Sequence, residues 1–120
     1  MITSKYFLEG EFNRCSPSCS LQDMKQTTMS KLDSAREIAG MPFVLTSAYR
    51  SPEHDRSKGR SGTGAHTLGR AIDIRCNTSR NRFLIVEALL KAGFKRVGVA
   101  NTFIHADDSE THDQEVLWLY

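Results

Sequence analysis

The sequence predicts a small single domain of the α+β class, in which two main helices flank a largely antiparallel sheet. Two stretches with helical apolar spacing fall early and in the middle of the chain, and short β-type runs with turn residues between them fill most of the rest. The 120 residues suffice for one real hydrophobic core, and no repeat or linker divides them. We therefore interpret residues 1–120 as one domain.

The two predicted helices are recognised by apolar spacing and by their end signals. The first follows Ser20, a typical N-cap, and covers residues 21–39 before Gly40. Its apolar side recurs at steps of three and four residues: Leu21, Met24, Thr28, Leu32, Ala35 and Ile38. The second helix begins at residues 77–79 and ends at Gly93. We expect its buried face to consist of Phe83, Val86, Leu89 and Leu90.

Five short stretches have the composition or the alternation of strands. Residues 43–49 are rich in β-branched and aromatic side chains, and residues 71–75 alternate between apolar and polar positions. Residues 96–99 and 102–106 are expected to form a hairpin, and residues 115–120 a last strand.

The overall charge excludes some classes of partner. A formal net charge of +2 does not by itself indicate nucleic acid or an acidic membrane. The alternative of a nucleic-acid patch rests on five cations, Arg56, Lys58, Arg60, Arg70 and Arg75, but no aromatic residues interleave with them. No stretch approaches 18 apolar residues, so we expect no membrane span. We expect a monomer without a nucleic-acid partner.

The cysteines and the N-terminus bear on the compartment. The three cysteines are an odd number, so at least one is unpaired in any disulfide scheme. Cys15 and Cys19 could pair, bind a metal or remain thiols, and we interpret them and Cys76 as free thiols of a reducing compartment. The first residues lack a basic region followed by an apolar run, so we predict no signal peptide.

Residues 62–75 carry the clearest chemistry. The alternation of strand 71–75 places Asp73 on the face opposite its isoleucine neighbours, and Gly69 permits a tight turn that returns His66 toward Asp73. His105 is the best candidate for a third ligand. Two imidazoles and a carboxylate suit zinc, and a site with three protein ligands plus water is of the catalytic kind. The alternative is that these histidines are ordinary core or surface residues.

Two further residues have the types that such chemistry needs. Asp107 is a candidate acid/base group and Arg50 a candidate cation for a developing oxyanion. The polar residues 51–64 are predicted to form a mobile loop beside the site. The charges of this loop are either a solvated surface or a substrate contact.

Three motifs carry a resemblance to a known family. They read SAYRSP at residues 47–52, GAHTLGRAID at residues 64–73 and FIHAD at residues 103–107. In this order they resemble the D-alanyl-D-alanine carboxypeptidase family of zinc peptidases, peptidase family M15. The chain looks most like the small murein peptidases of bacteria and phages, which are similar in fold to the hedgehog signalling domain. The resemblance covers roughly residues 20–110.

The resemblance implies roles for individual residues. His66, Asp73 and His105 would bind Zn²⁺ in a cleft on the sheet. Arg50 would contact a substrate carboxylate or carbonyl oxygen, which suits the planar donors of a guanidinium. Asp107 would reach the zinc-bound water as general base, or it would accept a hydrogen bond from His105 and orient that ligand.

One position departs from the family pattern. Several relatives have the catalytic carboxylate three residues before the last histidine, and here Thr102 occupies that place. The branch with a His-x-Asp element has an acid two residues after it, which corresponds to Asp107.

The implied function is zinc-dependent hydrolysis of a peptide bond in the stem peptides or cross-links of bacterial peptidoglycan. The lack of a signal peptide would suit a phage or prophage lysis enzyme that reaches the wall after release, or a domain of a larger exported protein. The rival interpretation is a zinc-stabilised binding module of the same fold without catalysis, which Thr102 favours.

Overall fold

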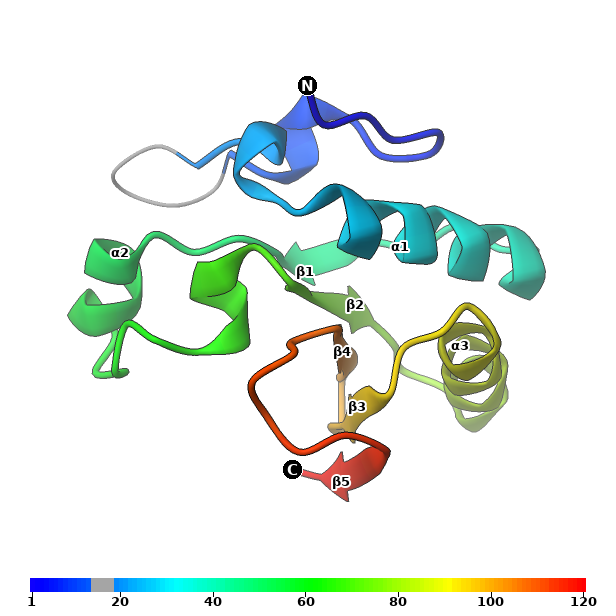
Figure 1. Ribbon diagram of the computed structural model, residues 1–120. Coiled ribbons are helices and arrows are strands. Elements are labelled where there is room, and N and C mark those ends of the chain that lie inside the picture. Colours follow the sequence, from blue (N-terminus) through cyan, green and yellow to red (C-terminus); the bar gives the residue numbers. More distant parts are fainter. Residues whose placement is uncertain (14–18) are drawn as a thin grey trace.

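The computed structural model describes residues 1–13 and 19–120 of the chain. Within these residues five strands form one sheet in the order β1-β2-β4-β3-β5, and helices α1 and α3 pack against one of its faces (Figure 1). The strands are β1 (Leu45–Ser47), β2 (Ala71–Arg75), β3 (Arg96–Val99), β4 (Phe103–Asp107) and β5 (Val116–Leu119). The helices are η1 (Glu9–Glu11), η2 (Leu21–Asp23), α1 (Gln26–Ala39), α2 (Pro52–Ser57), η3 (Ala65–Leu68) and α3 (Ser79–Lys91), where η marks a 3₁₀-helix. The predicted α+β class is confirmed.

The sheet is antiparallel except at one edge. Strands β1, β2, β4 and β3 pair antiparallel in that order, and β5 pairs parallel to β3. The predicted β3–β4 hairpin is present, and its turn is closed by Ala100 N–H, which donates to the carbonyl of Phe103. In this register Asp73 of β2 and Gly98 of β3 are both cross-strand partners of His105, on the two sides of β4.

The hydrophobic core lies between the sheet and the pair α1 and α3. The sheet contributes fully buried aliphatic side chains from its central strands: Ile72, Ile74, Val97 and Ile104. The helices contribute Met29, Leu32, Ala35, Ile85, Ala88 and Leu89. Because side chains alternate along a strand, the burial of Ile72 and Ile74 turns Asp73 to the opposite face, as predicted.

The first predicted helix is interrupted. Ser20 is the N-cap, and its side chain accepts a hydrogen bond from Gln22 N–H, but the helix that follows is the single 3₁₀ turn η2. Met24 is extended and α1 starts at Gln26, because Lys25 N–H leaves the helical pattern to donate to Gly69 O at 2.8 Å. The end of the helix at Gly40, which has φ +66°, is confirmed.

The predicted face of α3 is wrong in part. Thr78 caps the helix as expected, but Phe83 is 66% exposed and Leu90 49% exposed, while Ile85, Ala88 and Leu89 are buried. Phe83, Val86 and Leu90 also recur at steps of three and four residues, so spacing alone allows either face. Packing against α1 selects the other one.

The interpretation of residues 51–64 as one mobile loop is also wrong in part, since they contain α2. Ser51 is the N-cap, with its hydroxyl accepting from His54 N–H at 3.1 Å, and Pro52 occupies the first helical position. A Ser-Pro pair can start a turn or a helix, and here the helix buries Asp55.

The cysteine interpretation holds only for Cys76, which is a buried free thiol. Cys19 is disulfide-bonded, which corrects the free-thiol expectation for this residue. Cys15 lies outside the described residues. No helix in the described part of the chain is long and apolar enough to cross a membrane.

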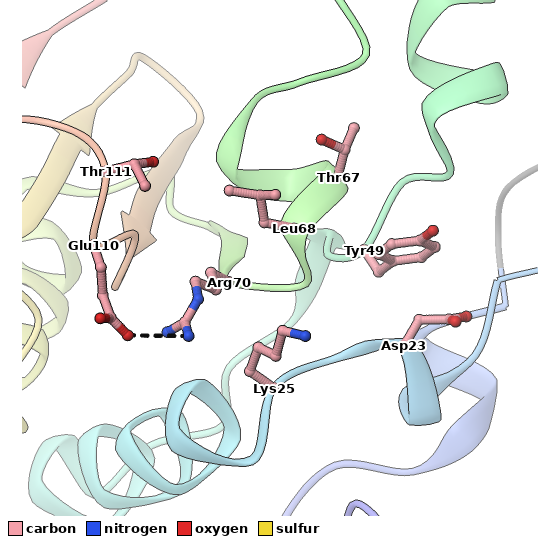
Figure 2. Close-up of a pocket in the computed structure, with 8 residues that line it drawn as sticks. All are labelled: Asp23, Lys25, Tyr49, Thr67, Leu68, Arg70, Glu110 and Thr111. Atoms are coloured by element: carbon pink, nitrogen blue, oxygen red, sulfur yellow. Dashed lines mark ion pairs between the residues drawn. The ribbon is translucent and has the colours of Figure 1, made fainter.

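The end of the turn η3 packs closely against the residues just before α1. Gly69 ends η3 with φ +73°, and an added Cβ there would collide with the carbonyl oxygen of Asp23. Beside this contact lies a surface hollow of about 550 Å³, shown in Figure 2, with the Arg70–Glu110 ion pair on one side. Its remaining lining residues are Asp23, Lys25, Tyr49, Thr67, Leu68 and Thr111.

Candidate metal centre

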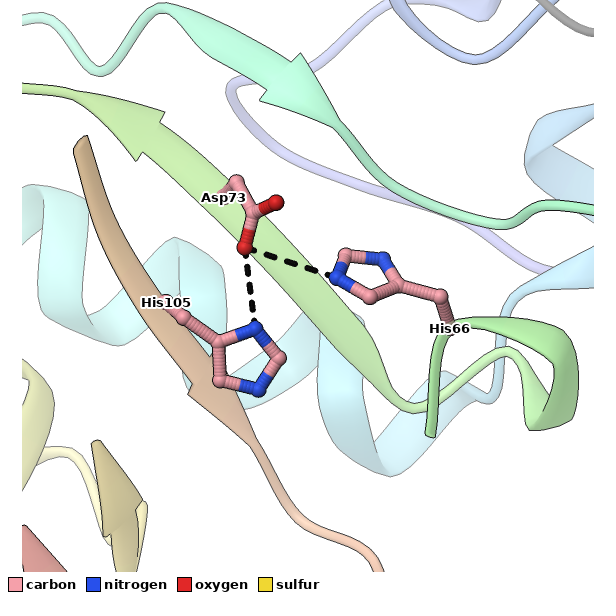
Figure 3. Close-up of side chains that lie close together, drawn as sticks. All are labelled: His66, Asp73 and His105. Carbon is pink, nitrogen blue, oxygen red and sulfur yellow. Dashed lines mark hydrogen bonds and ion pairs between the residues drawn. The ribbon is translucent and has the colours of Figure 1, made fainter. Parts of the chain in front are cut away.

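Three side chains converge on the sheet face that points away from the core. His66 comes from η3, Asp73 from β2 and His105 from β4 (Figure 3). One oxygen, Asp73 Oδ1, lies 3.4 Å from His66 Nε2 and 2.9 Å from His105 Nδ1. One potential ligand atom from each residue falls within 4.8 Å of the others. The structure therefore brings together all three predicted ligands.

The orientation of His66 is set by the backbone. Its Nδ1 lies 2.7 Å from the carbonyl oxygen of Ala48, which can only accept, so Nδ1 carries the proton. Nε2 is thereby left to face Asp73. Gly69 makes this possible, because its left-handed turn brings η3 back over the start of β2.

His105 is held by Asp107 on its far side. His105 Nε2 lies 2.7 Å from Asp107 Oδ2, which leaves Nδ1 to face Asp73. Asp107 is 1% exposed, and its other oxygen accepts from Arg96 Nε at 2.7 Å and from Ser109 N–H at 3.2 Å. A carboxylate that accepts from the second nitrogen of a ligating histidine fixes the tautomer and the ring orientation of that ligand.

The electrostatics favour charged partners in this cluster. Burial raises the pKa of Asp73, but hydrogen bonds from His105 and His66 outweigh it and hold the pKa well below its usual range. Burial lowers the pKa of His105, but the hydrogen bonds to Asp107 and Asp73 outweigh it and raise the pKa. Burial likewise raises the pKa of Asp107, and His105 and Arg96 bring it below its ordinary value. Both carboxylates are therefore anions at neutral pH.

The donor set fits zinc. Two imidazole nitrogens and one carboxylate oxygen are donors that Zn²⁺ binds readily, and three protein ligands leave a fourth position for water or substrate. Both histidines are buried, and the side chain of Asp73 is 14% exposed, so the cluster can be reached from solvent on one side.

Arg50 lies beside the cluster, three residues after the end of β1. Its backbone N–H donates to His66 O at 3.2 Å, and its Nη1 donates to Ser47 Oγ at 2.9 Å. Its Nε lies 3.2 Å from Asp55 Oδ1 of α2. Burial lowers the pKa of Arg50, as does the charge of Arg60, whereas Asp73 and Asp55 raise it. A hollow of about 280 Å³ runs from Arg50 along α2.

Several residues of the site were not predicted. Trp118 of β5 lies against His105, with ring centroids 5.4 Å apart, and the guanidinium of Arg96 sits 5.1 Å from the Trp118 ring. The alternation within residues 115–120 places Trp118 and Tyr120 on the same face of the strand. Nothing local in the sequence shows that β5 joins the sheet beside β3. Thr102 is exposed and takes no part in the cluster.

The fold and the donor set are those of an α+β domain with a buried His-Asp-His group that could hold a metal ion. A comparison with protein families finds that the family described as Peptidase M15 matches residues 5–107. The chain belongs to the peptidase M15 family, whose members are zinc-dependent metallopeptidases, so the resemblance drawn from the motifs is confirmed. A comparison with curated proteins found none that matches the chain.

Proposed function

We propose that the protein is a zinc peptidase that hydrolyses a peptide bond in the stem peptides or cross-links of bacterial peptidoglycan. The observation that carries this proposal is the convergence of His66, Asp73 and His105 in a chain of the M15 family. A family fold alone would support less, because one fold hosts many functions.

His66 Nε2, Asp73 Oδ1 and His105 Nδ1 would hold the metal. When bound, zinc supplies a Lewis acid that polarises a carbonyl group and lowers the pKa of water. Arg50 is the cation available to the substrate, because it borders the cluster and is partly accessible at 19% side-chain exposure. Its guanidinium would bind a substrate carboxylate or the carbonyl oxygen on which charge develops.

Asp107 was expected either to move the proton or to orient His105, and the contacts favour orientation. One of its oxygens accepts from His105 and the other from Arg96 and Ser109. Asp107 is also only 1% exposed, which keeps its oxygens away from water. We therefore assign Asp107 the orienting role.

A second candidate function is a zinc-stabilised binding module. Two observations favour it: Thr102 occupies the place of the family acid, and Asp107 is fully engaged in the protein. In that case zinc would stabilise the fold without any turnover.

The setting of the reaction follows from the proposed substrate. Peptidoglycan lies in the cell wall, so the protein would act there as a phage or prophage lysis enzyme or as part of a larger exported protein.

The test combines metal content with activity. Purified protein is expected to carry one zinc per chain and to release new amino groups from purified peptidoglycan, and a chelator is expected to abolish the release. His66→Ala and Asp73→Asn should bind far less than one zinc per chain. His112→Ala is the matched control, since this histidine bonds Ser109 and lies outside the cluster. Zinc without amino-group release would favour the binding module, and protein that never takes up zinc would refute both functions.

A further inference from the structure

The sheet face that carries the metal cluster continues into a group of aromatic rings. Trp118 lies next to His105, and Tyr120 lies next to Trp118 with ring centroids 6.2 Å apart. Phe103 completes the group, 5.2 Å from Tyr120. We call Phe103, Trp118 and Tyr120 the aromatic platform. It begins at a candidate metal ligand and extends toward the edge of the sheet.

Gly98 makes the inner end of the platform possible. It is the cross-strand partner of both His105 and Trp118, and a Cβ added to it would lie 2.6 Å from two atoms of the indole. The indole therefore covers the bare backbone of β3. Arg96 holds it from the side through its contact with the ring, and the same guanidinium donates to Asp107. The position of the indole is thus tied to that of the metal ligand.

The outer end of the platform is open to solvent. Tyr120 is 67% exposed, although two aromatic rings touch it. Leu117 and Leu119 alternate with Trp118 and Tyr120 along β5, so they point to the other face of the strand. The platform rings are therefore not turned inward to fill the core. They form an accessible aromatic surface beside the candidate metal centre, with neighbouring rings inclined to one another by 51° and 62°.

We propose that the aromatic platform binds a sugar ring of the peptidoglycan glycan strand, an inference that rests on the proposed function. The stem peptides carry mostly methyl groups and charged side chains, which offer little flat apolar area. The pyranose rings of the glycan do offer it, on the faces where C–H groups point outward. The electron-rich faces of Trp and Tyr attract such polarised C–H groups, as they attract the edges of other rings.

The position of a bound sugar sets the length of peptide between that sugar and the metal cluster. The far end of the platform lies two ring spacings from His105, at 5.4 and 6.2 Å. An extended chain spans about 3.3–3.6 Å per residue. About three to four extended residues therefore separate a sugar bound at Tyr120 from His105, and fewer separate a sugar bound at Trp118 from it.

The first experiment uses the intrinsic fluorescence of Trp118, the one tryptophan in the chain. The zinc-loaded protein is titrated with the glycan disaccharide that carries no peptide, so no hydrolysis can occur. A saturable change in emission is expected. Leu119→Ala, next to Tyr120 but on the other face of β5, should give the same titration as the unaltered protein. No change in emission at any disaccharide concentration would overturn the proposal, whatever the enzyme does to peptides.

The second experiment compares kcat/KM for a stem peptide with and without its glycan. The ratio of kcat/KM for the glycan-bearing peptide to kcat/KM for the free peptide should exceed one. This ratio should fall about three- to ten-fold in Tyr120→Ala, which is the loss expected for one aromatic contact. It should be unchanged in Tyr120→Phe, because that variant keeps the ring. Equal kcat/KM values for both substrates would refute the platform while the peptidase stands. If neither substrate is cleaved, the proposed function fails, and the disaccharide titration still decides whether the platform binds sugar.

Discussion

Replacing Gly69 by alanine should loosen the turn that holds His66. The new Cβ would overlap the backbone carbonyl of Asp23, and the residue would keep φ +73°. The left-handed conformation costs about 1–2 kcal/mol for a residue with a side chain. Forcing an extra carbon into a packed site costs roughly 1–3 kcal/mol more. We expect a total loss of about 2–5 kcal/mol.

The assay is thermal unfolding of the metal-free protein, followed by zinc titration. For a domain of this size each kcal/mol lowers Tm by roughly 3–5 °C, so Gly69→Ala should lower Tm by roughly 6–25 °C. Zinc affinity should fall as well, because relief of the overlap moves η3 and with it His66 Nε2.

Gly40 supplies the matched control. It has nearly the same backbone angle, φ +66°, but an added Cβ meets nothing within 4 Å. Gly40→Ala should therefore show only the conformational loss of about 1–2 kcal/mol and unchanged zinc affinity. Equal losses in the two variants would refute the reasoning, since the contact with Asp23 would then contribute nothing.

Three further predictions concern the cluster itself. Asp107→Asn should weaken zinc binding about 10–100-fold by competition with a chelator, because the orientation of His105 loses its anionic acceptor; unchanged affinity would contradict the orienting role. Asp55→Asn should leave one zinc per chain but lower kcat/KM, since Arg50 loses its ion-pair partner; if kcat/KM is retained, that pair does not position Arg50. In the metal-free protein Asp107 and Asp73 outweigh the effect of burial and raise the pKa of His105. The protonated His105 therefore stabilises the folded state. This contribution to the free energy of unfolding is complete below the ordinary pKa of 6.5 and is lost as the pH rises through the raised pKa. Tm of the metal-free form should therefore fall as the pH rises from about 6.5 through the raised pKa, and a flat Tm over this rise would count against the two hydrogen bonds.

The ligand set could be predicted because its information is mostly local. The alternation around Asp73 sets its face, and Gly69 predicts the turn that returns His66. His105 is distant in sequence and was assigned through its motif and the resemblance. The role of Asp107 could not be decided in advance, because the partners of its second oxygen, Arg96 and Ser109, depend on how β3 and the loop after β4 come together.

Other features depend on tertiary packing that no short window contains. Phe83 and Leu89 both satisfy helical spacing in α3, and only contact with α1 buries the second. Trp118 was placed in a strand correctly, but its approach to His105 requires the parallel pairing of β5 with β3. The break before α1 arises because Lys25 donates to Gly69, a residue in a different element.

The pairing of Asp73 with His105 across β2 and β4 also affects how the chain can misfold. A slip of one residue between two strands would turn one of these side chains to the apolar face and expose an isoleucine in exchange. The metal would then lose a ligand at the same moment as the core loses a side chain. Metal affinity and correct strand register are therefore coupled: zinc binding would stabilise the native register relative to registers shifted by one residue.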